Sequence, residues 1–282
     1  MSAKNFKIQK ITPAIGAEIS GIDLMETVSD DLLDAVYEAL IEHQVIFFRN
    51  QPITPAGHKA FAESFGEPEP PHPVYPHLEG HENIVLLSNG PDNPPDTDGW
   101  HTDLTFRQDP PFASFLMARK VPEIGGDTLW LSLTAAYEGL PEGLKSELEE
   151  MRAVHDLGDF RNTFASGESD GNKVNEAHRV LGSAVHPVVQ VHPVSGRKFL
   201  YVNEGFTQHL VGFGATESNR LLAYLYQHMQ RPEYQVRFRW SKEAMAIWDN
   251  RCTCHYATAD YLPQERVMHR ITVVRDSRVQ GT

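Results

Sequence analysis

A histidine and a carboxylate stand two residues apart in the segment Trp100-His101-Thr102-Asp103-Leu104-Thr105-Phe106. The flanking residues are mostly aromatic or β-branched, which predicts a strand. Neighbours at i and i+2 of a strand share a face, so we expect His101 and Asp103 to project together, with Thr105 behind them and the other residues opposite. An imidazole nitrogen and a carboxylate oxygen aimed at one point provide two ligands of the two-histidine, one-carboxylate set, which suits non-haem Fe(II) and leaves positions open for oxygen chemistry.

The third ligand of such a set must come from elsewhere in a chain that holds 14 histidines. We favour His255, because it follows the predicted strand 244–249 and precedes Arg266 and Arg270 by short intervals. A guanidinium group can bind a carboxylate with two parallel hydrogen bonds. The segment after His255 is therefore a candidate for holding an anion beside a metal.

Composition excludes several classes of protein. The chain has 282 residues, 40% of them hydrophobic, and is expected to form a single domain over residues 1–282. Its formal net charge of −13 argues against nucleic acid or an anionic membrane as partner, although local arginines can still bind a small anion.

Cellular location is predicted from the termini and the cysteines. No run approaches the ~18 apolar residues of a membrane-spanning helix, and the polar segment Met1–Lys10 does not resemble a signal peptide. Cys252 and Cys254 argue against a disulfide framework and are not a zinc set. We expect a cytoplasmic protein.

The elements that must position these residues are mainly strands. The expected strands cover residues 6–11, 17–22, 45–49, 82–87, 112–119, 127–131, 184–191, 198–202, 234–240, 244–249 and 269–275, and the expected helices 30–43, 54–65, parts of 132–151, and 216–229 with Thr216 as its cap. Strands and helices do not alternate regularly, which favours a β-sandwich or jelly roll with helices on its outside over a doubly wound sheet. The polar segment 159–176 is expected to be mobile.

Further motifs occur along nearly the whole chain, from Ile19-Ser20-Gly21 to Arg275. In chain order they are His72-Pro73-Val74-Tyr75-Pro76, His101-Thr102-Asp103, Gly125-Gly126-Asp127-Thr128-Leu129-Trp130, His192-Pro193-Val194-Ser195-Gly196, Val202-Asn203-Glu204-Gly205-Phe206-Thr207, Trp248-Asp249-Asn250-Arg251 and Met268-His269-Arg270. Together they resemble the taurine dioxygenase group of Fe(II)/2-oxoglutarate-dependent dioxygenases. The resemblance implies a double-stranded β-helix (a jelly roll, cupin-like), with mainly β structure and flanking helices.

The resemblance also implies the cofactors and their ligands. Fe(II) would be held by His101, Asp103 and His255. 2-Oxoglutarate would occupy two further iron positions, with its far carboxylate on Arg266 and Thr128, and O2 would take the last position. Conversion of 2-oxoglutarate to succinate and CO2 would then drive hydroxylation of a substrate carbon.

For the primary substrate, the resemblance points to an anionic small molecule, a sulfonate, and to a set of binding residues. These are His72, Tyr75, Thr97, Phe106, Phe206 and Arg270. Hydroxylation of taurine beside its sulfonate would release sulfite and aminoacetaldehyde, a reaction of sulfur metabolism. Relatives often carry an amide side chain where Thr97 stands, so a sulfonate is better supported than taurine in particular.

Several alternatives stay open at this point. The same chemistry on another alkylsulfonate, an alkyl sulfate ester or a phenoxyalkanoate would use the same core. A halogenase is disfavoured, because halide needs the position that Asp103 fills. Outside this class, a hydrolase with a zinc-bound water would not need Arg266 or Thr128, and a non-catalytic anion-binding protein of cupin-like shape would not need iron. The resemblance also implies a homo-oligomer (dimer or tetramer). For residues 159–176 two readings stay open, a lid that closes over the substrate and a merely disordered segment.

Overall fold

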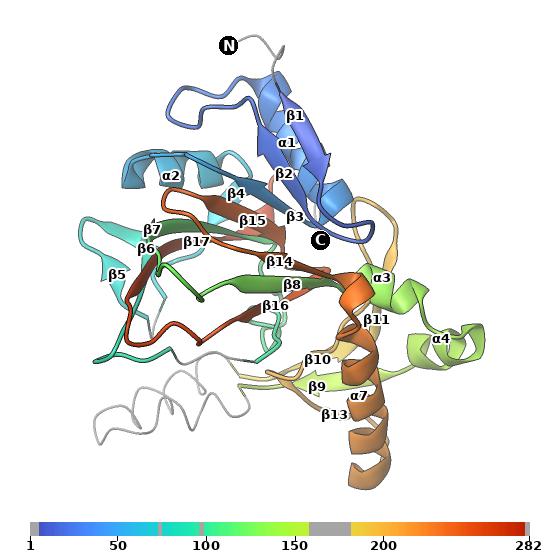
Figure 1. The fold of residues 1–282 in the computed structure, drawn as a ribbon. Helices are drawn as coiled ribbons and strands as arrows, with labels where there is room; N and C mark the ends of the chain where they lie inside the picture. The colour runs from blue at the N-terminus through green and yellow to red at the C-terminus, as the bar shows by residue number, and fades with distance from the viewer. Residues whose placement is uncertain (1–5, 73–74, 96–98, 158–181, 280–282) are drawn as a thin grey trace.

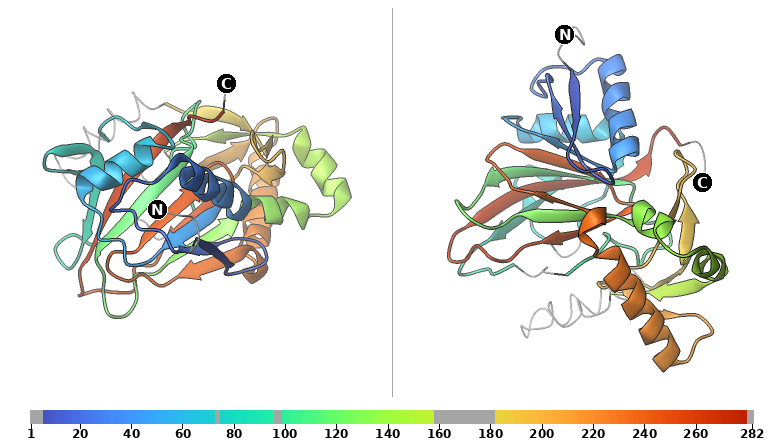
Figure 2. Two further views of the ribbon diagram at one scale, coloured as in Figure 1. Left: turned by 90° about the horizontal axis from the view of Figure 1, so that it is seen from above. Right: turned by 45° about the vertical axis from the view of Figure 1, so that its right-hand side comes forward.

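The computed structural model of the chain describes residues 6–72, 75–95, 99–157 and 182–279. The predicted substrate residue Thr97 and the predicted lid 159–176 lie outside the described residues. Two β-sheets face each other, and helices cover their outer sides (Figures 1 and 2). This arrangement confirms the mainly β fold with flanking helices that the sequence predicts.

The larger sheet has the strand order β1-β2-β3-β15-β7-β17-β6-β5, and β4 pairs with β17. Its strands are β1 (Lys7–Lys10), β2 (Ala17–Ser20), β3 (Val45–Phe48), β4 (Gly66–Pro68), β5 (His77–Leu78), β6 (His81–Asn89), β7 (Ala113–Lys120), β15 (Met245–Asp249) and β17 (Arg266–Asp276). The facing sheet has the order β14-β8-β16. Its strands are β8 (Thr128–Ser132), β14 (Gln235–Phe238) and β16 (Thr253–Ala257).

Smaller sheets and helices complete the described chain. The small sheets are β10-β9-β13 and β11-β12, with strands β9 (Arg152–His155), β10 (Ala184–Pro187), β11 (Val189–Val191), β12 (Lys198–Leu200) and β13 (Thr207–Leu210). The helices are α1 (Asp30–His43), α2 (Pro55–Glu63), α3 (Leu133–Glu138), α4 (Glu142–Glu149), α7 (Ala215–Met229) and the 3-10 helix η2 (Pro232–Tyr234).

Alternation along the strands builds the core in layers. Inward residues such as Phe47, Trp248 and Met268 from the large sheet pack with Trp130 and Phe238 from the facing sheet. Residues of the opposite parity on the large sheet pack beneath α1 and α2 in a second cluster. The third large cluster lies under α3, α4 and α7. Because the central strands β3, β15 and β7 are buried on both faces over nearly their whole length, their polar inward residues are confined to the space between the sheets.

Local signals account for the helices on the outer side of the large sheet. The Thr54 hydroxyl accepts a hydrogen bond from the Gly57 amide at 3.1 Å, and Pro55 occupies the first turn of α2. Helix α1 has the predicted bounds, and acidic residues in its first turn favour the helix dipole. The predicted cap of α7 was wrong: Gly214 is the cap residue, and Thr216 lies inside the first turn.

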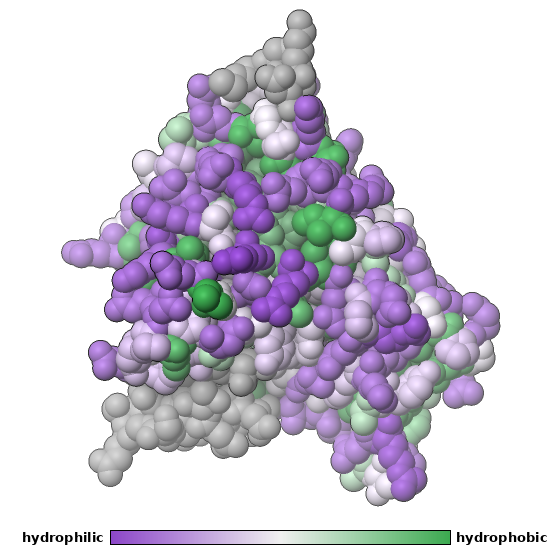
Figure 3. Space-filling model, viewed as in Figure 1, coloured by the Kyte–Doolittle hydropathy of each residue, from purple (hydrophilic) through white to green (hydrophobic). Residues whose placement is uncertain are grey.

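The molecular surface in the view of Figure 3 is mostly hydrophilic, and apolar residues appear on it in small separate groups. Among the helices that the structure describes, none has both the length and the apolar character that a membrane crossing requires.

Candidate functional site

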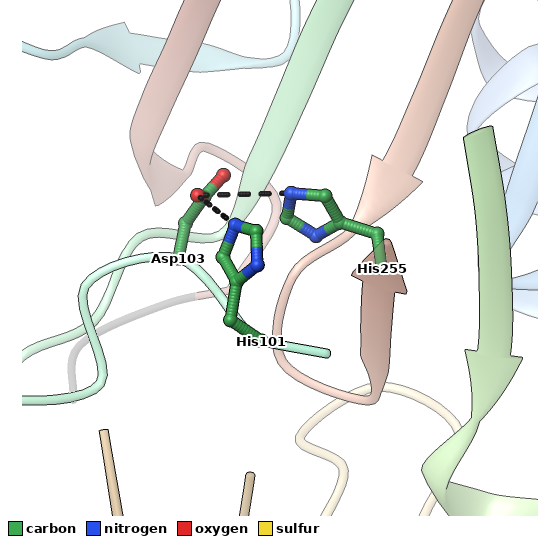
Figure 4. Close-up of side chains that lie close together, drawn as sticks. All are labelled: His101, Asp103 and His255. Atoms are coloured by element: carbon green, nitrogen blue, oxygen red, sulfur yellow. Dashed lines mark ion pairs between the residues drawn. The ribbon is translucent and has the colours of Figure 1, made fainter. Parts of the chain in front are cut away.

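His101, Asp103 and His255 meet in the space between the sheets, as predicted. Nε2 of His101 lies 3.7 Å and Nε2 of His255 lies 3.9 Å from Oδ1 of Asp103. All three residues are buried, and their ligand atoms lie within 4.8 Å of one another. Figure 4 shows the three side chains pointing toward one another. This spacing suits three donors around one metal ion.

The two histidines are brought together by an isolated β-bridge. The amide of His101 donates to the carbonyl of His255 at 3.0 Å, and the amide of His255 donates back at 2.8 Å. Strand β16 carries His255 inward because its neighbours Cys254 and Tyr256 face the cluster under the helices. Strand β16 was not predicted from the sequence.

The prediction of a strand over residues 100–106 was wrong. Only His101 makes a bridge, residues 103–106 form a turn, and Leu104 has a positive φ of 57°. The turn is held by the side chain of Asn250, which accepts from the Asp103 amide at 3.1 Å and donates to the Asp103 carbonyl at 2.9 Å. A side chain thus supplies the hydrogen bonds that a neighbouring strand would have supplied.

The protonation states suit metal binding. Nδ1 of His101 lies 2.9 Å from the Gly99 carbonyl, which places the proton there and leaves the lone pair of Nε2 facing Asp103. Burial, followed by the charge of His101, lowers the pKa of His255 to about 3, so this imidazole is neutral near neutral pH. Two imidazole nitrogens and one carboxylate form a donor set that fits Fe(II).

The carboxylate of Asp103 is ionised although it is buried. Burial raises its pKa, but the charge of Arg270, followed by the two histidines, outweighs burial and lowers the pKa to about 2. The Ser114 hydroxyl donates to Oδ2 at 3.2 Å, and Arg270 Nη1 lies 3.5 Å from Oδ1. Oδ1, which faces both histidines, is the oxygen placed to bind a metal.

Arg266 lies deep between the sheets on β17. Its Nη2 donates to the Thr128 hydroxyl at 3.2 Å, and the Trp240 indole donates to the same hydroxyl at 3.0 Å. Burial lowers the pKa of Arg266 to about 10, and its buried Nε has no hydrogen-bond partner among the described residues. A buried guanidinium without a carboxylate partner in the described chain fits an anionic ligand. The structure thus brings together the predicted pair, Arg266 and Thr128.

Arg270 shares the inward face of β17 with Arg266, since residues four apart on a strand have the same parity. Its guanidinium lies 5.7 Å from the centre of the Tyr75 ring, and that ring lies 4.9 Å from His72. Both arginines thus lie on one strand, β17, and face the space between the sheets.

His72 is a neutral hydrogen-bond donor. Burial, followed by the charges of Arg270 and Arg107, lowers its pKa to about 3. The Tyr75 amide donates to Nδ1 at 3.2 Å, so the proton of the neutral ring sits on Nε2. His72 and Arg270 can therefore both donate hydrogen bonds to an anion.

Phe106 and Phe206 form an apolar wall next to the metal ligands. Their ring centres are 5.1 Å apart, and Phe206 lies edge-on to His101 at 6.2 Å. With Leu157 they make a small cluster, against which Leu104 packs. A regular strand would have placed Phe106 on the face opposite His101, but the turn at Leu104 returns it to the same side. The family-based prediction of Phe106 near the site thus agrees with the geometry, whereas its predicted strand face does not.

A second group of possible ligands, His192, Asp249 and Cys252, is a closed structural network. Backbone amides of Val194 and Ser195 donate to Nδ1 of His192, so Nε2 carries the proton that it donates to Asp249 at 3.0 Å. Arg251 neutralises the same carboxylate at 2.6 Å. No lone pair of His192 is left for a metal.

Sequence reasoning missed the residues that hold the ligands in place. Ser114, Trp240 and Asn250 occupy inward or strand-end positions whose polarity stands out against apolar neighbours. That parity was a usable signal for Ser114. Asn250 appears in the Trp248-Asp249-Asn250-Arg251 motif, but its role was missed because its partner Asp103 lies in a turn that was not predicted.

Residues 7–272 match the family model described as "Taurine catabolism dioxygenase TauD, TfdA family". The chain belongs to this family. It is 38% identical over 279 residues to an alkylsulfatase of Acinetobacter baylyi, which covers 96% of this chain and 85% of the relative. It is 36% identical to an alpha-ketoglutarate-dependent sulfate ester dioxygenase of Pseudomonas putida, which covers 96% of this chain and 90% of the relative.

Solved structures lead to the same family. The crystal structure of a taurine dioxygenase from Burkholderia xenovorans superposes with a TM-score of 0.82 at 35% identity, covering 96% of this chain and 90% of that chain. The predicted double-stranded β-helix is thereby confirmed. Membership of the TauD/TfdA family also confirms the predicted Fe(II)/2-oxoglutarate-dependent dioxygenase, with Fe(II), 2-oxoglutarate and O2 as its cofactors.

Proposed function

We propose that this enzyme hydroxylates the carbon next to the sulfur-containing group of a small organic monoanion, a sulfonate or a sulfate ester. The observation that carries the proposal is the position of Arg270. Its guanidinium lies between Asp103 and the Tyr75 ring, so an anion that it binds is held next to the metal ligands. The similarity to a taurine dioxygenase and to a sulfate ester dioxygenase supports both substrate types.

The residues are proposed to divide the work as follows. His101, Asp103 and His255 hold Fe(II), and Arg266 with Thr128 binds the far carboxylate of 2-oxoglutarate. When bound, Fe(II) would supply the oxidising chemistry with O2 as the oxidant, while 2-oxoglutarate is oxidised to succinate and CO2. The side chains of this protein bind and orient the cofactors and the substrate.

Binding of the substrate anion rests on complementary donors. Arg270 offers a charged guanidinium, and His72 offers Nε2–H without adding a second positive charge. Phe106 and Phe206 exclude water beside His101 and guide the carbon chain of the substrate toward the metal. Hydroxylation of the carbon that bears the sulfur group makes an adduct that collapses to an aldehyde, releasing sulfite from a sulfonate or sulfate from a sulfate ester.

The test is product formation by anaerobically reconstituted Fe(II) enzyme with 2-oxoglutarate, oxygen and a panel of taurine, longer alkanesulfonates, alkyl sulfates and phenoxyacetates. Succinate matched one to one by sulfite identifies a sulfonate substrate, and succinate matched by sulfate identifies a sulfate ester. Succinate coupled only to a phenoxyacetate would contradict the proposed substrate class. Taurine is the sulfonate expected from the sequence. Succinate formation coupled only to longer alkanesulfonates would exclude taurine as the substrate.

The Arg270→Ala variant supplies a second test. Because the guanidinium that binds the substrate anion is lost, the KM of the organosulfur substrate should rise. The affinity for 2-oxoglutarate should be kept, because Arg266 and Thr128 are unchanged. An unchanged KM would show that the anion binds elsewhere.

The predicted cytoplasmic location and homo-oligomeric state stay predictions.

A further inference from the structure

Glu69 and Arg107 form an ion pair at the edge of the proposed substrate site, and neither was selected from the sequence. Nη2 of Arg107 lies 2.6 Å from Oε1 of Glu69. Glu69 is 6% exposed, and the side chain of Arg107 is 22% exposed. Burying a carboxylate carries a desolvation cost that an ion pair recovers only in part, so such a pair is weak support for stability by itself. A role in geometry is therefore worth testing.

Each partner is anchored through its backbone to the framework. The amide of Glu69 donates to the Thr272 carbonyl of β17 at 2.7 Å, and the Asn83 side chain of β6 donates to the Glu69 carbonyl at 2.8 Å. The carbonyl of Arg107 lies 3.0 Å from Nε2 of His186 on β10, and its amide donates to Leu104 at 3.0 Å. The ion pair thus joins two backbones that are each held elsewhere.

The two anchored segments carry opposite sides of the site. Glu69 precedes His72 by three residues, and Arg107 follows the ligand Asp103 by four. Contacts run from Asp103 to Arg270, on to Tyr75, and from the Tyr75 amide to His72. Together with the short chain segments 69–72 and 103–107, the ion pair closes these contacts into a ring that includes the anion-binding side chains of Arg270 and His72.

We propose that the Glu69–Arg107 ion pair is a positioning pair that sets the distance between the anion-binding His72 and the metal-binding turn at Asp103. The inference rests on the proposed function. A positioning pair acts through its contact, so neutralising either partner should loosen His72 and weaken substrate binding. A direct attraction between Arg107 and the substrate anion acts through charge, so neutralising Glu69 would instead strengthen binding. The sign of the Glu69 effect separates the two.

The experiment compares Arg107→Met, Glu69→Gln and the double variant as full-length Fe(II) enzyme, with whichever organosulfur compound the wild type converts. Each single variant should raise the KM of that compound about tenfold, since small misplacements are costly. The KM of the double variant should be about the same as the higher of the two single-variant KM values, because both changes break the same contact. The apparent affinity for 2-oxoglutarate and the thermal midpoint should change little.

The matched control is Arg278→Met. Arg278 pairs with Asp34 at 2.7 Å and has a side chain 29% exposed, but it packs on Tyr37, away from the site. The positioning role is overturned if Glu69→Gln lowers the substrate KM, or if both single variants behave as Arg278→Met does. It is also overturned if the affinities for the organosulfur substrate and for 2-oxoglutarate and the thermal midpoint all fall together. A wild type that couples 2-oxoglutarate to no organosulfur compound overturns the proposed function and this inference with it. Coupling in the wild type with unchanged substrate KM in the variants overturns the ion-pair inference alone.

Discussion

At the level of single residues, the two arginines of β17 differ in what neutralises them. Arg270 lies against Asp103, whereas Arg266 contacts the Thr128 hydroxyl and the Trp240 ring and makes no ion pair within 4.0 Å among the described residues. A buried cation of this kind binds a carboxylate strongly, because leaving it unpaired in a low dielectric is costly. Arg266 is therefore the position where loss of one side chain should affect 2-oxoglutarate most selectively.

Arg266→Ala should weaken the apparent affinity for 2-oxoglutarate by about a hundredfold or more, since losing a buried bidentate partner costs on the order of several kcal/mol. Arg266→Lys should recover only part of the loss, because an ammonium cannot reproduce the fork geometry. Succinate formation against 2-oxoglutarate concentration measures both. The exposed Arg239→Met is the control, and equal effects in the two positions would refute the assignment.

Metal stoichiometry tests the distinction between the two clusters of possible ligands. The described part of the chain holds two such clusters, but the proton on Nε2 of His192 blocks the second. One Fe(II) or Mn(II) per chain should therefore bind, and Asp103→Ala should abolish binding. His192→Gln should keep one ion per folded chain. Metal analysis after dialysis checks this, and two ions in the wild type would contradict it.

At the level of elements, the site depends on a close approach between two loops. A Cβ at Gly205 would lie 2.9 Å from Cβ of His101, and the Gly205 amide donates to the Trp100 carbonyl at 3.3 Å. The backbone after β12 thus lies directly on the segment that presents His101, and glycine is the residue that permits this approach.

Gly205→Ala should weaken Fe(II) binding roughly tenfold by displacing His101 from its place beside Asp103. Iron titration followed by activity measures the change. Gly143→Ala is the control: a Cβ there meets nothing within 4 Å. In the first turn of helix α4 that substitution should leave iron affinity unchanged. Unaltered iron affinity in Gly205→Ala would show that the loop yields without moving the ligand.

At the level of the whole molecule, buried neutral histidines make the fold sensitive to acid. His58 and His155 are each 0% exposed. Burial, followed by the charge of Arg119, lowers the pKa of His58 to about 3, and burial followed by His186 does the same for His155. The unfolded chain therefore binds more protons than the native chain once the pH falls below the ordinary histidine pKa of about 6.5.

The sign of the pH effect follows directly. The free energy of unfolding is not reduced by these histidines above pH about 6.5, and it falls progressively as the pH is lowered toward about 3. At pH 5 the loss is up to about 2 kcal/mol per histidine. His58→Met should therefore show a smaller loss of unfolding free energy between pH 7.5 and pH 5 than wild type. Urea unfolding of metal-free protein measures it. The exposed His209→Met should keep the wild-type slope, and equal slopes in all three proteins would refute this origin.

Much of the site followed from the sequence because strand periodicity is local. The i, i+2 spacing placed His101 and Asp103 side by side even though their segment is a turn. The predicted strand 269–275 included Arg270 but stopped short of Arg266, and the structure places both on β17. The ordered motifs indicated the family, and with it the cofactors and the double-stranded β-helix.

The tertiary structure alone decided which distant groups meet. The bridge between His101 and His255, the hold of Asn250 on the Asp103 turn and the return of Phe106 toward Phe206 join segments from about 100 to 150 residues apart. Glu69 and Arg107 are only 38 residues apart (107 − 69), but their pairing also depends on tertiary structure, because it joins loops that carry no periodic pattern. Periodicity reports which face a side chain takes on its own element, but contacts between elements depend on how the sheets fold over each other, and no local pattern encodes that.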